Sequence, residues 1–257
     1  MLEHDLSFAA LVCGCIFLGA LAGMSVGARL PAHHLDKPTE DAVRIAMGTL
    51  ATMTALVLGL LVAAARSSFD TRAGEITQMA GDLILLDRQL VRYGPGADEA
   101  RQILRRYALH GVRAAWPDEF GRSDEAKGWM LLETAQDRIG ALAPEDDAHR
   151  WLRDRALEVS GVVARTRWLL DVQRASSLQG PFLGVLVLWL TALFASFGVF
   201  APRNGTVIVA MLVCSISIAA SIYLILEMDR PFGGAIRIPS APMREMLVRL
   251  GLPEGGS

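Results

Sequence analysis

Four long stretches of this sequence contain no charged residue and no histidine. They cover residues 7–28, 45–65, 176–202 and 204–226. A helix rises about 1.5 Å per residue, so about 20 residues cross a hydrocarbon core of about 30 Å. Buried helices of a soluble protein are the alternative, but four stretches above ~18 residues favour membrane spans. We predict an all-α protein with four transmembrane helices, at about 7–28, 45–65, 179–201 and 205–226.

The first stretch is predicted to be a retained span rather than a signal peptide. Glu3 and Asp5 make the preceding segment acidic, and no lysine or arginine comes before Ser7. A signal peptide has a basic start and an apolar region of only ~7–15 residues.

Charged residues are concentrated between the second and third stretches. Residues 66–175 hold 17 of the 25 basic and 18 of the 27 acidic residues, which predicts a water-exposed domain. Apolar residues recur there at helical spacing. One series is Phe69, Ala73, Ile76, Ala80, Leu83 and Leu90, with Asp87 in its gap, and another is Leu152, Ala156, Val159, Val163, Thr166 and Leu170. The predicted domains are a transmembrane hairpin (1–65), an inserted cytoplasmic helical bundle (66–175) and a second hairpin with a C-terminal tail (176–257).

Proline positions predict where the helices begin and end. No proline occurs between Thr39 and Gly94, which predicts that the second span continues as one helix to Tyr93. Two further helices are expected at 98–115 and 124–142, and a last one starts around Pro144, which suits a first turn. This last helix is expected to continue into the third span, with a bend at Gly180-Pro181. No segment alternates as a strand does, so no strand is predicted.

Basic residues near the span ends predict the orientation. Four spans place both termini and the helical domain on one side, which carries eight such residues, against four on the other side. Cytoplasmic flanks are enriched in arginine and lysine, so the termini and the domain are predicted to be cytoplasmic. The four opposite residues are Arg29, Lys37, Arg44 and Arg203. Only two of the 25 basic residues are lysine, which hints at a GC-rich bacterial genome and hence a bacterial inner membrane.

Small residues recur every four positions in the first two spans. The two stripes are Gly19, Gly23 and Gly27, and Ala51, Ala55, Gly59 and Ala63. Without bulky side chains, two backbones approach closely, and this packing drives helix association in lipid. The stripes either join the first two spans as a hairpin or form a subunit contact. The short connecting loop favours the hairpin.

No motif in this sequence indicates an enzyme. There is no HExxH, no phosphate-binding loop, no dinucleotide-binding glycine pattern and no Gly-x-Ser-x-Gly turn. His33 and His34 precede acidic residues, but adjacent histidines share no helix face, so solvated loop residues are favoured over metal ligands. Cys13, Cys15 and Cys214 lie in spans and are expected to be reduced packing residues. We predict no catalytic residue, metal or cofactor, and the net charge of −2 argues against a nucleic-acid partner.

The predicted spans contain no acid or base. Ionisable groups inside a membrane mark proton or substrate relays, so this composition argues against a proton-coupled pump. A channel stays open, because hydroxyl groups or an apolar constriction can line a pore. Thr49 and Thr52 share one face of the second span and are the candidate pore-lining residues. The alternative, commoner for threonine in membrane helices, is a hydrogen bond to a carbonyl of its own helix.

The fourth span ends in an acidic motif at the predicted membrane edge. Its candidate gate or docking residues are Glu227, Asp229, Arg230, Pro231 and Phe232. Carboxylates near a helix C-terminus face the negative end of the dipole, at a cost of about 0.3–1 kcal/mol each. A partner is expected to offset them, and the candidates are Arg230, Arg237, Arg66 and Arg174. A helix stop at Pro231, followed by a glycine turn, is the simpler alternative.

Two blocks resemble a bacterial membrane protein family. The first is residues 66–71 (RSSFDT) with Leu85-Leu86-Asp87-Arg88 and Arg92-Tyr93-Gly94-Pro95, and the second is residues 226–234 (LEMDRPFGG). They resemble a four-span family of unknown function described as bestrophin-like, over most of the chain. The name implies a relation to bestrophins, oligomeric anion channels with cytosolic helical domains. The chain departs from bestrophins in lacking their acidic calcium-binding cluster and their aromatic pore neck, since residues 45–65 contain no phenylalanine.

Two functions stay open on the sequence. One is an oligomeric bestrophin-like ion channel in the lipid bilayer. The alternative is a membrane-anchored sensor or scaffold whose cytoplasmic helical bundle binds a protein partner. Four spans without polar groups hardly enclose a pore alone, so the channel requires a homo-oligomer.

Overall fold

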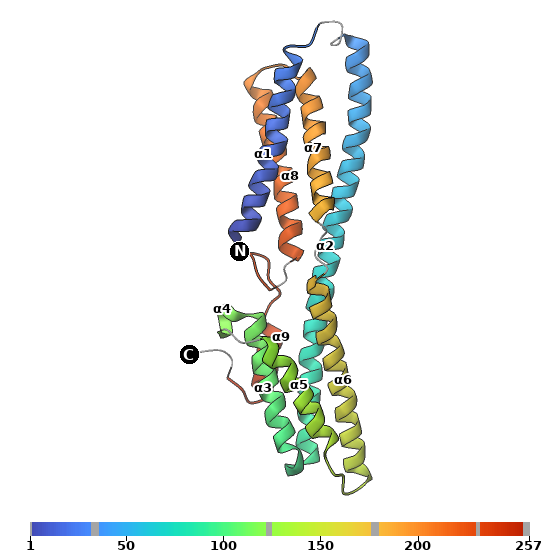
Figure 1. The fold of residues 1–257 in the computed structure, drawn as a ribbon, viewed down its shortest axis with the longest axis vertical. Coiled ribbons are helices and arrows are strands. Elements are labelled where there is room, and N and C mark those ends of the chain that lie inside the picture. Colours follow the sequence, from blue (N-terminus) through green and yellow to red (C-terminus); the bar gives the residue numbers. More distant parts are fainter. Residues whose placement is uncertain (1, 32–35, 122–124, 176–179, 230–231, 254–257) are drawn as a thin grey trace. The chain divides into compact units, whose positions relative to one another are not determined.

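The computed structural model describes residues 2–31, 36–121, 125–175, 180–229 and 232–253. No strand occurs among these residues, which form helices and turns, so the all-α prediction is confirmed. The long helices are α1 Leu2–Gly27, α2 Lys37–Tyr93, α3 Asp98–Ala115, α5 Glu125–Gly140, α6 Asp147–Ala175, α7 Gly180–Phe200 and α8 Gly205–Asp229 (Figure 1). The short ones are η2 Pro95–Ala97, α4 Pro117–Phe120 and α9 Ala241–Arg249.

Four helices are long and apolar enough to cross a membrane. The qualifying segments are Leu6–Gly27, Lys37–Tyr93, Leu183–Phe200 and Gly205–Asp229. Each overlaps one predicted span, which confirms four candidate membrane helices. The second of them is one helix of 57 residues that continues to Tyr93, as predicted. The predicted continuation of α6 into α7 falls on residues 176–179, which lie outside the described residues.

The start of α6 differs from the prediction. The helix begins at Asp147 rather than around Pro144. Asp146 precedes it, and its Oδ1 accepts a hydrogen bond of 2.7 Å from the backbone N–H of His149. This side chain satisfies an N–H group that the first turn leaves unpaired, so Asp146 sets the helix start. The same hydrogen bond lowers the pKa of the Asp146 carboxyl.

The chain forms two compact units. The membrane unit consists of Met1–Phe69 and Ser176–Arg237, and the helical unit consists of Asp70–Ala175 and Ile238–Ser257. Helices α1, α7 and α8 build the core of the membrane unit with Val12, Ile16, Ala20, Leu183, Leu186, Leu190, Phe194 and Ile222. Val57, Leu58 and Leu61 of α2 pack against this core while keeping part of their surface exposed. One face of α2 is therefore occupied within the membrane unit.

The glycine stripe of α1 lies against α7. A Cβ atom added at Gly19 would lie 2.8 Å from Cγ2 of Thr191. At Gly23 it would overlap the carbonyl oxygen of Ala195, and at Gly27 that of Val199. The prediction that this stripe packs against the second span is therefore wrong. The stripe packs against the third span instead.

The contact between α1 and α7 is close because both helices contribute small residues. A Cβ atom added at Gly198 of α7 would overlap the carbonyl oxygen of Ala20 on α1. The fit is therefore mutual. A short connecting loop brings α2 near α1 in sequence, but the complementary glycine lies on α7.

The small residues of the second span behave differently. Ala55, Gly59 and Ala63 are exposed, and Ala51 is half-buried. A Cβ atom added at Gly59 has no neighbour within 4 Å among the described atoms. That these residues pack against another helix stays a prediction, and that helix would belong to another copy of the chain.

The helical unit buries the apolar series predicted from its sequence. Ile76, Leu83 and Leu90 of α2 are almost fully buried, and so are Ala156, Val159 and Val163 of α6. Asp87, which interrupts the first series, is buried as well. It accepts hydrogen bonds from Nε (2.7 Å) and Nη2 (3.2 Å) of Arg101 on α3. This bidentate pair explains a carboxylate in an apolar series and raises the pKa of Arg101.

The C-terminal segment contains a helix that the sequence did not predict. The Trp116 indole N–H donates to the carbonyl oxygen of Ile238 (3.0 Å), and the Ser240 hydroxyl donates to Glu119 (2.6 Å). Arg244 pairs with the same Glu119 carboxylate. Met243, Met246 and Leu247 of α9 are buried. The segment predicted as a tail therefore folds into the helical unit.

We expect Gly23→Leu to destabilise the contact between α1 and α7. Overpacking costs ~1–3 kcal/mol, and the obstacle here is a backbone oxygen rather than a flexible side chain. The matched control is Gly14→Leu on the same helix, where a Cβ atom meets nothing within 4 Å. Thermal unfolding in detergent should give a lower midpoint for Gly23→Leu. Equal midpoints for both variants would contradict the close contact.

Asp82→Asn should stabilise the protein at neutral pH. Oδ2 of Asp82 is buried without a hydrogen-bond partner in the described structure, and burial raises the pKa of this carboxyl. A carboxyl with a raised pKa in the folded state weakens folding when ionised and ceases to do so as the pH falls toward about 4. The gain in unfolding temperature should therefore be present at pH 7.5 and shrink near pH 4.

The control for Asp82→Asn is Asp137→Asn, at an exposed position of α5. It removes one carboxylate without removing a buried one. The same pH-dependent gain in both variants would refute a burial effect at Asp82.

Candidate functional site

The candidate pore-lining threonines lie on an exposed face of α2. Thr49 and Thr52 are exposed, whereas Thr54, on the opposite face, is only 4% exposed. Steps of three or four residues return to the same side of a helix. Helix α2 therefore has one face against the membrane unit's core and another turned away from it.

The exposed face continues along α2 within the membrane unit. Its exposed positions, three or four residues apart, are Ile45, Thr49, Thr52, Leu56, Leu60, Ala63 and Ser67. We call these positions the exposed stripe of α2. The stripe is apolar around Leu56 and Leu60, small at Ala63 and polar at Ser67. Hydroxyl groups and apolar constrictions are both found in ion pathways.

The two threonine hydroxyls bond to their own helix. Oγ1 of Thr49 donates to the carbonyl oxygen of Ile45 (3.1 Å), and Oγ1 of Thr52 donates to that of Gly48 (2.9 Å). Each hydroxyl hydrogen is therefore used, and the oxygen lone pairs still face outward. The exposed side of each threonine can accept a hydrogen bond or contact a cation. Pore lining by Thr49 and Thr52 stays a prediction.

At the end of α8, Glu227 is a buried carboxylate held by backbone amides. Glu227 is only 1% exposed. Oε2 accepts hydrogen bonds from the backbone N–H of Ala235 (2.6 Å) and of Ile236 (3.4 Å). Oε1 is buried and has no hydrogen-bond partner in the described part of the chain. Glu227 therefore ties the end of the fourth candidate membrane helix to the turn that follows it.

Gly234 makes this arrangement sterically possible. Its φ of +109° lies in the left-handed region, and a Cβ atom there would overlap Oε2 of Glu227 and lie 3.0 Å from Cδ. The partner predicted for this motif was an arginine, whereas the donors to Oε2 of Glu227 are backbone amides. Arg237 donates from Nε to the carbonyl oxygen of Gly234 (2.8 Å), on the same turn. Sequence reasoning missed this because hydrogen bonds to backbone leave no mark in side-chain identity.

The other residues of the motif are less informative. Asp229 and Phe232 are half-buried, and each has an interaction partner. Arg230 and Pro231 lie outside the described residues. Their predicted role as a gate or docking element is untested.

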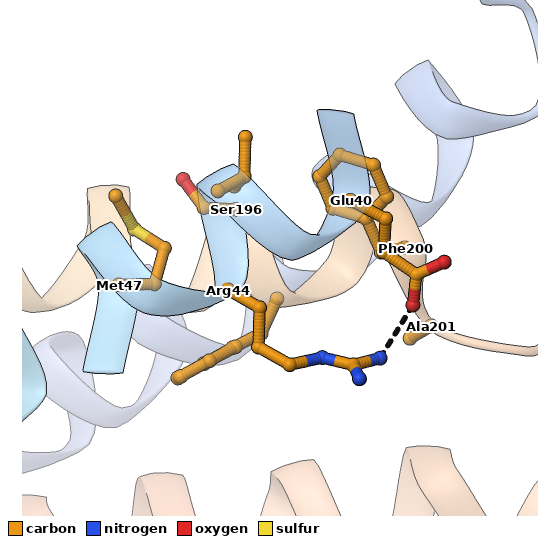
Figure 2. Close-up of a pocket in the computed structure, with 8 residues that line it drawn as sticks. Glu40, Arg44, Met47, Ser196, Phe200 and Ala201 are labelled. Atoms are coloured by element: carbon orange, nitrogen blue, oxygen red, sulfur yellow. Dashed lines mark hydrogen bonds and ion pairs between the residues drawn. The ribbon is translucent and has the colours of Figure 1, made fainter. Parts of the chain in front are cut away.

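A small pocket lies between α2 and α7 in the membrane unit. Its volume is about 150 Å³, and its lining consists of Glu40, Val43, Arg44, Met47, Ser196, Phe197, Phe200 and Ala201. Figure 2 shows the Arg44 guanidinium reaching the Glu40 carboxylate, with which it forms an ion pair one helical turn away. The two charges offset each other. The remaining walls are mainly apolar.

Metal ligands do not gather in the described residues. No group of three or more histidine, cysteine, aspartate or glutamate side chains is placed to hold an ion there. His33 and His34 lie outside those residues. Cys13 and Cys15 are free and half-buried, and Cys214 is free and exposed on α8. That Cys214 is a packing residue stays a prediction, since its exposed position on α8 lies within a candidate membrane span.

These features define a multi-pass, all-helical membrane protein. The family model of the bestrophin-like domain matches residues 14–243. The chain therefore belongs to the bestrophin-like family, as the two sequence blocks suggested. No curated protein matches the sequence.

Solved structures of bacterial bestrophin homologues share this fold. A homologue from Klebsiella pneumoniae is 16% identical and superposes with a TM-score of 0.57, covering 98% of this chain and 100% of that one. A variant of that homologue has 15% identity, a TM-score of 0.61 and coverages of 96% and 98%. A structure described as a membrane protein variant has 15% identity, a TM-score of 0.62 and coverages of 95% and 99%. At this identity the likeness concerns the fold alone.

Gly234→Ala should destabilise the turn through a clash with Glu227 in addition to backbone strain. Left-handed strain alone costs about 1–2 kcal/mol. The matched control is Gly121→Ala, where φ is +80° and a Cβ atom meets nothing within 4 Å. Thermal unfolding should show the larger loss for Gly234→Ala.

A double-mutant cycle isolates the contribution of the Glu227 side chain to the loss of stability. In a Glu227→Ala background, Gly234→Ala should cost no more than Gly121→Ala does. An undiminished loss would mean that the carboxylate is not the obstacle.

Proposed function

We propose that this protein is an oligomeric ion channel in which α2 from each copy lines a central pore. The observation that carries the proposal is the exposed stripe of α2. One face of α2 packs on the core of its own membrane unit, while the stripe faces away from it. In lipid, an apolar helix has no reason to carry the polar side chains of Thr49 and Thr52 on its outward face.

A ring of copies gives this stripe a role. Turned toward a shared axis, Thr49 and Thr52 would supply hydroxyl oxygens, and Leu56 and Leu60 an apolar constriction. Ser67 would continue the pathway with a hydroxyl group. The small residues Ala55, Gly59 and Ala63 would let neighbouring α2 helices approach closely.

The orientation belongs to the same proposal. Helices α3–α6 follow the second span and precede the third. We place this inserted bundle and both termini on the cytoplasmic side of a bacterial inner membrane, because basic residues near span ends are more numerous on that side. The carboxylate of Glu227, near the cytoplasmic end of α8, would couple that helix to the turn at Gly234. We propose this link as the gate or docking element.

A second function is favoured by the surface of α6. Trp151 (62%), Trp168 (61%) and Val172 (58%) are exposed on this helix of the helical unit. Large exposed apolar side chains mark contact surfaces. In a channel they would contact other copies. In a sensor or scaffold they would bind a cytoplasmic protein partner, and the purified protein would be a monomer without ion flux.

Ion flux from liposomes tests the channel, and cysteine labelling tests its wall. In a background with Cys13, Cys15 and Cys214 replaced by alanine, Thr52→Cys lies on the stripe and Thr54→Cys on the packed face. A charged methanethiosulfonate reagent should reduce flux several-fold in Thr52→Cys and leave Thr54→Cys unaffected. The two positions are matched in residue type and depth.

Each alternative outcome counts against the channel. Liposomes without flux, or a monomer by light scattering in detergent, would favour the scaffold. Equal sensitivity of Thr52→Cys and Thr54→Cys would show that the stripe is not the pore wall.

A further inference from the structure

Three arginines lie at the loop ends of the membrane unit, and two of them have partners. Arg44 at the start of α2 forms an ion pair with Glu40. Arg203, before α8, donates from Nη2 to the carbonyl oxygen of Met24 near the end of α1 (3.0 Å). The exposed side chain of Arg29, two residues after α1, makes no hydrogen bond or ion pair in the described part of the chain.

Arg29 and Arg203 line the same pocket. Its volume is about 550 Å³, and the other lining residues are Leu21, Met24, Ser25, Ala28 and Ile208. Two guanidinium groups and no carboxylate belong to this lining. The pocket is therefore cationic at Arg29 and Arg203 and apolar at Leu21, Met24 and Ile208.

The position of the pocket corresponds to the level of lipid headgroups. It lies where α1 ends at Gly27 and α8 begins at Gly205, at the limits of two candidate membrane spans. Below it, exposed apolar side chains continue along both helices, including Leu18 (63%) on α1 and Val209 (59%) on α8. A ligand seated here would have its polar end beside the arginines and its apolar part beside the spans.

We propose that this pocket binds the phosphate headgroup of an anionic phospholipid. Guanidinium groups bind phosphate oxygens in a bidentate manner, and two of them favour a headgroup with net negative charge. A zwitterionic headgroup adds an ammonium group, for which the lining offers no carboxylate. A soluble phosphate would leave the apolar walls unused. Binding would also supply the counterion that Arg29 lacks on a side of the membrane where basic residues are sparse.

Lipid titration of the full-length protein in detergent tests this site, with native mass spectrometry as the readout. Dioleoyl phosphatidylglycerol is the probe, and dioleoyl phosphatidylcholine and inorganic phosphate are the comparators. Phosphatidylglycerol should bind in preference to both. Arg29→Gln should weaken its binding about fivefold, the effect of one basic residue near an anionic headgroup, and Arg29→Lys should retain most of it.

Arg44→Gln is the matched control, because it removes an arginine at the same end of the membrane unit whose charge Glu40 already offsets. It should leave phosphatidylglycerol binding unchanged. Equal losses in Arg29→Gln and Arg44→Gln, or equal binding of phosphatidylcholine, would overturn the proposal. Competition by inorganic phosphate at the same Arg29-dependent site would overturn the assignment to lipid. None of these outcomes depends on ion flux, so this test of the lipid site is independent of the channel proposal.

Discussion

The architecture of the membrane unit depends on the close approach of α1 and α7. Lipid chains are as apolar as leucine, so burial of apolar surface does not hold two helices together in a bilayer, and packing must do so. Gly23, Gly27 and Gly198 remove the side chains that would separate the two backbones. With α7 in this position, α8 completes the core through Ile222, and α2 contributes only one of its faces.

The exposed stripe follows from this arrangement. Since the strongest packing partner of α1 is α7, the small residues of α2 remain available for another copy of the chain. Within the membrane unit the stripe keeps one helical phase from Ile45 to Ser67. A helix that changes from an apolar to a polar outward face suits a pathway leading out of a membrane. A scaffold would require no such continuity.

Features encoded in a local period were predictable from the sequence. Charge-free length identified the spans, absence of proline predicted α2 up to Tyr93, and three- and four-residue spacing identified buried residues such as Leu83 and Val163. Features set by distant backbone were not predictable. The partner of Gly23 is a carbonyl group on the third span, and Glu227 is held by amide groups of a turn eight and nine residues later. The cap at Asp146 is local, but the preference of proline for a first turn led to a predicted start around Pro144.

The distribution of positive charge connects the proposed orientation with the proposed lipid site. A basic residue on the side with fewer basic residues opposes the positive-inside tendency unless something offsets its charge. Glu40 does so for Arg44, and the carbonyl oxygen of Met24, at the negative end of the α1 dipole, does so for Arg203. Arg29 has no such group in the described chain, and it lines a pocket together with Arg203. The proposed lipid phosphate would complete the series, and the proposed orientation and the pocket would then have the same electrostatic explanation.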